Sequence, residues 1–393
     1  MPPRTEERNA AAEEQRLRPG ILVNRRRNPA RRKLAADTHM KALLTFLLAL
    51  GVALSGNAFA DDATKLRLIT WADYVPADVI ALFKKETGIQ VQVTLSNNEE
   101  MISKLRATGG AGYDLAQPSQ DRITGVQREF GIYKPIDLSK VKVEQFRPEI
   151  LDITRKNTTL DGKLYALPYL WGSDGLVANT KRTKVSDYPD LCRPDLKGKT
   201  SMRLRRPTLM AFAFASGKDP FALYGNPAAY TALMESVGKT LSACKANVRF
   251  FFDNKDQLLN GMRSGEILAA MMWDTGGWTL NRENPDIQFI VPRSGALGWL
   301  DTFALPAKGR NDAGAYAWIN FTMRPDVAAR ITRAVGNWTA ARGTEALVDQ
   351  KMRAQFNASF PEGAFKNIKW YPAIPPGLEE IEGRILDRIK AAN

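Results

Sequence analysis

From Lys65 onward, stretches typical of strands alternate with stretches of helical periodicity. KLRLIT (65–70) and IQVQVTLS (89–96) predict strands, the second by its period of two. Between them, PADVIALFKKETG (76–88) predicts a helix that begins near a proline and ends at a glycine. The same alternation continues along the chain and predicts an α/β fold made of βαβ units with a mainly parallel sheet. Further strands are expected at 113–119, 176–181, 247–252 and 267–273, and further helices at 98–110, 121–131, 207–217, 256–266, 312–323, 325–336 and 378–392.

The N-terminal region has the pattern of an export signal. Residues 40–60 contain one lysine, the apolar run Ala42–Leu54 and the A-x-A cleavage motif Ala58-Phe59-Ala60. This pattern predicts a signal peptide that is cleaved after Ala60, because the apolar run is too short for a membrane-spanning helix. Residues 1–39 are rich in arginine and precede Met40; we interpret them as a disordered extension or as sequence upstream of the true start.

Removing the leader changes the charge of the chain. Residues 1–60 hold 11 of the 56 basic and 5 of the 42 acidic residues, which leaves 45 basic and 37 acidic residues, a net charge of +8. No charge run resembles a nucleic-acid-binding arm, so no nucleic-acid partner is expected. The single histidine, His39, lies upstream of the leader. Histidine-dependent nucleophiles and histidine metal sites are therefore excluded from the mature chain.

The two cysteines, Cys192 and Cys244, allow two readings. An exported protein meets an oxidising compartment, where a pair of cysteines favours one disulfide. Two separate buried thiols fit the spacing equally well, because spacing does not fix the distance between Cα atoms.

Candidate binding residues occur where predicted strands end, the place where α/β sheets hold ligands. They are Trp71, Ser119, Arg203, Arg205, Trp273 and Asp274, with Trp299 and Asp301 in the apolar segment GWLDTFALP. In SMRLRRPT (201–208), an extended chain places Arg203 and Arg205 on one face, ahead of a helix that Pro207 opens. Arg206 then faces the other way, toward solvent.

Several segments, taken in order, carry a resemblance to a known family. They are LITWADYVP, FKKETGIQV, YDLAQPS, YALPYLWGSDGLVAN, MMWDTGGW, GWLDTFALPA and WINFTMRPDVAARI. Together they resemble the spermidine/putrescine-binding periplasmic proteins of ABC importers over most of residues 65–392. The resemblance implies a two-lobed periplasmic-binding-protein fold with a ligand cleft between the lobes and hinge crossings. Lobe 1 would comprise 61–170 and about 302–345, and lobe 2 would comprise 171–301 and about 346–393.

The resemblance also implies a ligand site. Its members would be Trp71, Tyr74, Ser119, Trp273, Trp299, Asp301 and Tyr371. Asp301 would pair with a ligand ammonium, Asp274 would be a second acceptor, and the aromatic rings would face the cation and its methylene chain.

The sequence departs from the family in SMRLRRPT. Arg205 and Thr208 stand where the family carries carboxylates for the second ammonium of a polyamine. Arg203 and Arg205, with the N-terminus of the following helix, would suit a carboxylate. Two ligands stay open: an ω-amino acid such as 4-aminobutyrate, held at both ends, or a polyamine, with the arginines facing elsewhere.

The resemblance and the composition together imply a solute-binding protein. We expect a periplasmic monomer that captures a small amine-containing or zwitterionic ligand and passes it to an inner-membrane ABC permease. No cofactor, metal or enzymatic activity is expected. The alternatives are an exported enzyme without histidine chemistry and a structural exported protein.

Overall fold

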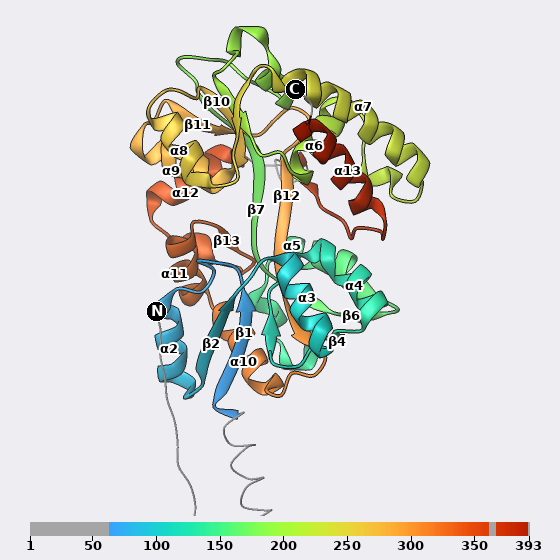
Figure 1. Ribbon diagram of the computed structural model, residues 1–393. Coiled ribbons are helices and arrows are strands. Elements are labelled where there is room, and N and C mark those ends of the chain that lie inside the picture. The colour runs from blue at the N-terminus through green and yellow to red at the C-terminus, as the bar shows by residue number, and fades with distance from the viewer. Residues whose placement is uncertain (1–62, 361–366, 392–393) are drawn as a thin grey trace, which may run out of the picture. The chain divides into compact units, whose positions relative to one another are not determined.

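Two long strands carry the chain between two α/β lobes (Figure 1). They are β7 (Ala166–Asn179) and β12 (Leu297–Pro306), and they pair antiparallel along their length. The computed structural model describes residues 63–360 and 367–391. The lobe boundaries predicted at 170/171 and 301/302 fall inside these two strands.

The first lobe is formed by the chain before β7 and by its return after β12 (Figure 1). Its central strand pairs parallel with a neighbour on each side, so that Leu68 lies opposite Val93 and Leu115. The elements are β1 (Lys65–Thr70), α2 (Ala77–Thr87), β2 (Gln90–Leu95), α3 (Asn98–Thr108), β3 (Leu115–Ala116), η1 (Gln120–Arg122), α4 (Ile123–Phe130), β4 (Tyr133–Lys134), η2 (Leu138–Lys140), η3 (Val143–Gln145), α5 (Pro148–Thr158), β5 (Thr159–Leu160), β6 (Lys163–Leu164), α10 (Asp312–Thr322), α11 (Pro325–Val335), β13 (Trp338–Thr339) and η7 (Thr344–Ala346).

The second lobe follows β7 and receives the C-terminal part of the chain (Figure 1). Its helices enclose an apolar cluster that includes Phe212, Tyr230 and Ile385. The elements are η4 (Tyr188–Cys192), η5 (Pro194–Leu196), β8 (Thr200–Met202), α6 (Arg206–Ala215), η6 (Phe221–Leu223), α7 (Pro227–Lys245), β9 (Val248–Phe251), α8 (Lys255–Arg263), β10 (Ala269–Trp273), α9 (Asp274–Glu283), β11 (Ile287–Ile290), α12 (Gln350–Ser359), β14 (Lys369–Trp370) and α13 (Leu378–Ala391).

One mixed sheet runs through both lobes in the order β2-β1-β3-β12-β7-β10-β8-β9. The register of β12 against β7 shifts between Asp301, which faces Leu170, and Thr302, which faces Pro168. A proline has no N–H to donate to a neighbouring strand. Pro168 therefore donates no hydrogen bond to β12 at this point, and the N–H of Thr302 donates to the carbonyl of Pro118, at 2.9 Å. The irregularity therefore brings Asp301 to the loop that follows β3, as bulges re-aim side chains elsewhere.

Periodicity predicted several elements of the first lobe well and the crossing strands poorly, and the strand expected at 113–119 is only β3, Leu115–Ala116. β1, β2, α3 and α4 lie within one to two residues of the predicted ranges. The strand expected at 176–181 is only the end of β7, which begins ten residues earlier. β7 is buried on both faces along almost its whole length, so it carries no alternation that a pattern search could detect.

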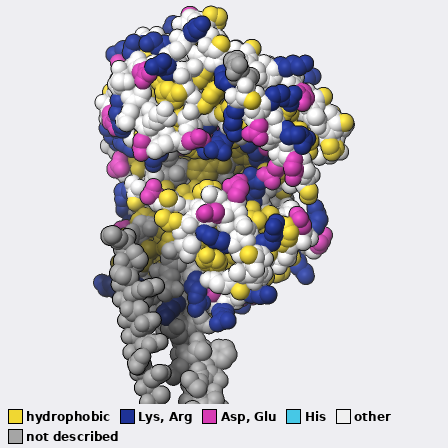
Figure 2. Space-filling model, viewed as in Figure 1, with side chains coloured by type: hydrophobic (Ala, Val, Ile, Leu, Met, Phe, Trp, Pro, Cys, Tyr) yellow, Lys and Arg dark blue, Asp and Glu magenta, His cyan; other side chains and the backbone are white. Residues whose placement is uncertain are grey.

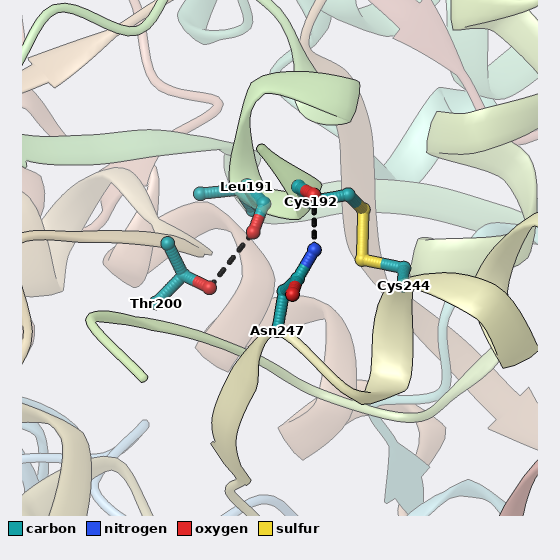
Figure 3. The surroundings of a disulfide bond; sticks show 5 residues. All are labelled: Leu191, Cys192, Thr200, Cys244 and Asn247. Carbon is teal, nitrogen blue, oxygen red and sulfur yellow. Dashed lines mark hydrogen bonds between the residues drawn. A yellow bond between two sulfur atoms is a disulfide. The ribbon is translucent and has the colours of Figure 1, made fainter. Parts of the chain in front are cut away.

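A disulfide joins Cys192, at the end of η4, to Cys244 in the last turn of α7, with their Cα atoms 4.9 Å apart (Figure 3). Two hydrogen bonds hold the same corner. The amide of Asn247 donates to the carbonyl of Cys192 at 2.6 Å, and the hydroxyl of Thr200 donates to that of Leu191 at 2.8 Å. The bond closes a loop with a sequence separation of 52, which the chain-entropy model values at roughly 4 kcal/mol of stability.

The proposed extension and leader, residues 1–60, lie outside the described residues. Within the described ranges, no helix has the length and apolar character needed to cross a membrane. The same ranges contain no cluster of three or more acidic, histidine or cysteine side chains suited to a metal ion.

Candidate ligand-binding site

Strand register gathers three of the candidate side chains and one further carboxylate on one face of the sheet. On β12, Trp299 and Asp301 are two residues apart and so share a face. Asp174 of β7 lies opposite Leu297, on that same face, and Trp273 of β10 lies opposite Asp174. We call Asp174, Trp273, Trp299 and Asp301 the site floor. Figure 2 shows a hollow between the two lobes, with hydrophobic side chains at its base and charged side chains of both signs along its rims.

The middle of the floor is aromatic. Trp299 lies directly opposite Gly172 of β7, and a Cβ atom at that glycine would lie only 2.4 Å from the indole ring. The glycine is therefore what allows the ring to lie across the neighbouring strand. The indole Nε1 is buried and has no hydrogen-bond partner among the described residues. A ring in this position offers both an apolar surface and one free donor between the two carboxylates.

Asp301 forms the first end of the site. Tyr74 donates its hydroxyl to one carboxylate oxygen and Ser119 donates its hydroxyl to the other, each at 2.5 Å. Ser119 is fixed in turn by two hydrogen bonds with the amide of Asn98, at 3.0 and 3.1 Å. Two loops of the first lobe, one of them supported by the first residue of α3, thus converge on a carboxylate that β12 carries.

This carboxylate is buried without a cation. Asp301 is 4% exposed, and burial raises its pKa to about 7 although both hydrogen bonds act to lower it. No lysine or arginine of the described chain contributes to this balance. A buried carboxylate in this state gains most from a positively charged partner. The geometry therefore suits a ligand ammonium.

Two aromatic side chains of the loop after β1 lie near each other, and one of them, Tyr74, bonds to Asp301. The Trp71 ring lies 6.2 Å from the Tyr74 ring, and its Nε1 donates to the carbonyl of Gln117 at 2.9 Å. Between them, Asp73 adopts a φ of 65°, in the left-handed region that aspartate tolerates better than most residues. The tight turn returns Tyr74 toward Asp301, and burial raises the pKa of its phenol well above the usual value.

Arg203 and Asp174 form the second end. The Arg203 guanidinium lies 4.6 Å from the centre of the Trp273 ring, and its Nε is buried without a hydrogen-bond partner. Asp174 is 4% exposed, and burial raises its pKa to about 7, while Arg203 acts to lower it. No ion pair within 4.0 Å joins the two groups. Two opposite charges therefore stand near each other, neither of them satisfied by the described chain.

Tyr371 completes this end. Its hydroxyl is buried and has no hydrogen-bond partner within the described ranges, while its backbone pairs with Gly298 and Gln120. Its position next to β12 comes from β14, where Lys369 lies opposite Leu297.

Comparison with known proteins places the chain in a family. The family model described as bacterial extracellular solute-binding protein matches residues 78–358. The chain belongs to this family of solute-binding proteins. The spermidine/putrescine-binding periplasmic protein of Escherichia coli is 30% identical over 340 residues, which cover 84% of this chain and 94% of the relative. The putrescine-binding periplasmic protein PotF of the same organism is 26% identical, covering 86% and 95%.

Solved structures show the same fold. The spermidine/putrescine substrate-binding protein of Streptococcus pneumoniae superposes with a TM-score of 0.70 at 23% identity, covering 83% of this chain and 98% of the other. A solved GABA receptor superposes with a TM-score of 0.65 at 16% identity, covering 83% and 97%. The two-lobed fold expected for this solute-binding protein is thereby confirmed.

The three arginines of SMRLRRPT take three different environments in the solute-binding protein. The strand β8 ends at Met202, before any of them, so the two faces expected of an extended chain do not form. Arg205 is exposed and pairs with Asp253 at 2.9 Å, so the protein itself supplies its anionic partner. Arg203, expected on the same face as Arg205, is the one held over Trp273.

The expectation that Arg206 faces solvent is wrong. Its side chain is only 13% exposed and pairs with Asp121 at 3.1 Å and with Glu382 at 3.0 Å. It also donates to the hydroxyl of Tyr224 and lies 4.9 Å from the ring of Tyr371. The first turn of α6 points it inward, where it links the second lobe to η1 of the first.

Asp274 lies on the opposite face of the sheet from the site floor. Its carboxylate accepts hydrogen bonds from the N–H and hydroxyl of Ser173, at 2.8 and 3.1 Å, and from the N–H of Thr275 at 2.7 Å. Its acceptors are thus engaged by the protein, and burial raises its pKa to about 7. The neighbouring Trp273 belongs to the floor, and the carboxylate that shares the floor with it is that of Asp174, directly opposite on β7.

The sequence reading missed Asp174, which lies in the segment WGSDG. Only the pairing of β7 with β12 and β10 shows that it shares a face with Asp301 and Trp273. The signal that could have found it is its offset of two residues from Gly172, the glycine that accommodates Trp299.

Proposed function

We propose that this solute-binding protein is the periplasmic component of an ABC importer and that it captures a small amine-bearing solute between its lobes. It would pass the solute to an inner-membrane permease and act as a monomer without cofactor or catalysis. The relatives named for spermidine and putrescine support this role. The disulfide supports an oxidising compartment, and cleavage after Ala60 is part of the proposal.

One observation carries the proposal: Asp301 is a buried, uncompensated carboxylate whose two oxygens are already oriented by Tyr74 and Ser119. An ammonium arriving there gains a charge-assisted hydrogen bond in a site from which water is largely excluded. Trp71 and Trp299 stand near the path of its methylene chain and can contribute cation–π contact.

The other end supports a ligand with a carboxylate. Arg203 has no anionic partner within 4.0 Å among the described residues, and a guanidinium held in this way favours an anion. A polyamine would bring a second positive charge toward it, whereas an ω-amino acid such as 4-aminobutyrate would pair with Asp301 at one end and with Arg203 at the other. Of the two candidates, the contacts favour the ω-amino acid. A solved GABA receptor with the same fold is compatible with this choice.

Closure of the lobes would follow from where the contacts originate. Tyr74 and Ser119 belong to the first lobe, and Arg203 and Trp273 belong to the second. A ligand that touches both sets binds the closed state better and shifts the population toward it. The contacts of Arg206 with Asp121 across the lobes would add to the stability of the closed state.

The proposal is tested by calorimetry and intrinsic fluorescence with putrescine and 4-aminobutyrate. We expect measurable heat with at least one of them and a change in tryptophan emission, because Trp71, Trp273 and Trp299 lie at the site. Asp301→Asn is expected to abolish that binding, while Asp195→Asn, which removes an exposed carboxylate of the second lobe paired with Arg193, leaves it unchanged. A folded protein that binds no amine, or an Asp301→Asn variant that binds as well as the wild type, would overturn the proposal.

A further inference from the structure

Asp174 and Arg203 lie near each other at the second end of the site. Neither a polyamine nor an ω-amino acid would pair with both of them. Its carboxylate is 4% exposed and accepts no hydrogen bond from the described residues; the only contact of this residue with Tyr188 is through the backbone carbonyl. A buried carboxylate without a donor is costly, and native proteins keep such groups where they serve a purpose.

The charged groups of the floor can be counted. Asp301 and Asp174 carry negative charge when ionised, and Arg203 carries positive charge. Their charged neighbours are engaged elsewhere: Asp274 by Ser173 and Thr275 on the opposite face, Asp121 by Arg206, and Asp253 by Arg205. When all three groups are ionised, Asp301, Asp174 and the adjacent Arg203 together carry a net charge of −1, and a complementary ligand has a net charge of about +1.

We propose that the ligand is a linear diamino monocarboxylic acid, with its terminal ammonium on Asp301, its α-ammonium on Asp174 and its α-carboxylate on Arg203. This inference rests on the proposed function and names the substrate class of the same site. An α-ammonium and an α-carboxylate share one carbon, and Asp174 and Arg203 are close enough to perturb each other's ionisation. The hydroxyl of Tyr371 and Nε1 of Trp299 are buried donors without a hydrogen-bond partner among the described residues.

The spacing along the strands fits a chain of some length. Asp174 lies opposite Leu297, four residues from Asp301 on the same strand, which separates the two positions by roughly 13 Å at about 3.3 Å per residue. Each ammonium–carboxylate contact takes up about 2.8 Å. Between the ends lies Trp299, whose ring can cover the methylene groups. The length favours a chain as long as that of lysine or ornithine over shorter ones.

Other ligand classes leave a group unsatisfied. A diamine pairs with both carboxylates but leaves the Arg203 guanidinium unpaired and adds a like charge near it. An ω-amino acid pairs with Asp301 and Arg203 but leaves Asp174 buried without a partner. Only the diamino acid satisfies all three groups, and an unpaired buried group is what weakens binding most.

Two series of matched ligands test the inference by calorimetry. The first is L-lysine, cadaverine, which lacks the carboxylate, and 6-aminohexanoate, which lacks the α-amine. The second is L-ornithine with putrescine and 5-aminopentanoate. We expect the diamino acid to bind the wild type at least about tenfold more tightly than either of its truncated analogues, from the range for hydrogen bonds to charged groups.

Two variants assign each preference to its residue. In Asp174→Asn, lysine and 6-aminohexanoate should bind with equal affinity, because the α-amine has lost its partner. In Arg203→Met, lysine and cadaverine should bind with equal affinity. Arg249→Ala, which removes an exposed arginine of the same lobe paired with Glu266, is the matched control and should leave all affinities unchanged. Circular dichroism and thermal melting check that each variant folds.

The outcomes separate this inference from the proposed function. If putrescine or cadaverine binds most tightly, or if an ω-amino acid equals the diamino acid, the inference is overturned while the amine receptor stands. If the folded wild type binds no compound of either series, both fail. Preferences in Asp174→Asn that match those of the wild type would also overturn it.

Discussion

The two ends of the site floor differ in how the protein treats its charged groups. At one end, Asp301 accepts hydrogen bonds from Tyr74 and Ser119, and Asn98 holds Ser119 in turn. At the other end, Asp174 accepts no hydrogen bond, and Arg203 rests on the Trp273 ring with a free Nε. The first end is preorganised for one kind of group, an ammonium. At the second end, no hydrogen bond or ion pair joins Asp174 and Arg203, and only packing holds them in place. The selectivity of this end depends on which charges the ligand brings.

The largest expected effect is at the preorganised end. Asp301→Asn removes the charge and keeps the shape, so an amine ligand should lose at least about 3 kcal/mol of binding free energy, within the range for breaking a buried charge pair. Calorimetry measures the loss. An effect smaller than that of Arg203→Met would reverse the ranking of the two ends.

The pH dependence of stability should report both ends together. The pKa values of Asp174, Asp274 and Asp301 are raised from 3.8 to about 7, so the folded protein retains protons that the unfolded chain has released. Their contribution to stability is therefore complete below about pH 4 and is lost as the pH rises toward and through 7. The ligand-free wild type should lose melting temperature between pH 5 and 8 relative to Asp301→Asn and to Asp174→Asn. If the melting temperatures of all three proteins changed with pH in the same way, neither carboxylate would have the raised pKa on which this prediction depends.

The arginines sharpen the comparison within the second end. Arg203→Met should weaken a carboxylate-bearing ligand by about 1.5–3 kcal/mol. Arg205→Met should change affinity by less than about 0.5 kcal/mol, because Arg205 forms an exposed pair with Asp253. The two titrations are run with 4-aminobutyrate and with lysine. If Arg205→Met lost more affinity than Arg203→Met, the ligand carboxylate would lie at the exposed Arg205 and not at Arg203.

The smallest of these effects concerns the aromatic support of Arg203. Trp273→Leu removes the ring 4.6 Å from the guanidinium and should weaken a carboxylate-bearing ligand by about 1 kcal/mol, the scale of a partly buried cation–π contact. An amine without a carboxylate should be affected less. Equal losses for both kinds of ligand would mean that the ring contacts the ligand itself.

The sequence could predict only those site residues whose positions depend on local strand ends. Trp71 and Ser119 were proposed from the rule that ligands lie beyond strand ends, and the family resemblance added Tyr74; Trp71 directly follows β1, and Ser119 lies three residues beyond the short β3. Asp174 was missed because its direction depends on the register of β7, a strand without alternation.

The arginines show a second limit of the sequence. Their directions were inferred from an extended backbone, but β8 stops at Met202 and α6 begins at Arg206. Because the helix begins at Arg206, this side chain points inward, whereas an extended backbone would have turned it toward solvent. Arg206 became a buried link to Asp121 and Glu382, partners that lie 85 and 176 residues away in the chain. No local pattern reports contacts at that separation.

The central claim, that a ligand ammonium binds the buried Asp301 carboxylate, is tested most directly by counting the protons released on binding. Calorimetry at pH 6.5 in buffers of different ionisation enthalpy gives this number. Since the pKa of Asp301 is about 7 without ligand, an arriving ammonium should expel a proton from the wild type, and Asp301→Asn, where any binding remains, should release fewer. Binding of an amine that releases no protons, or the same number in both proteins, would contradict the account.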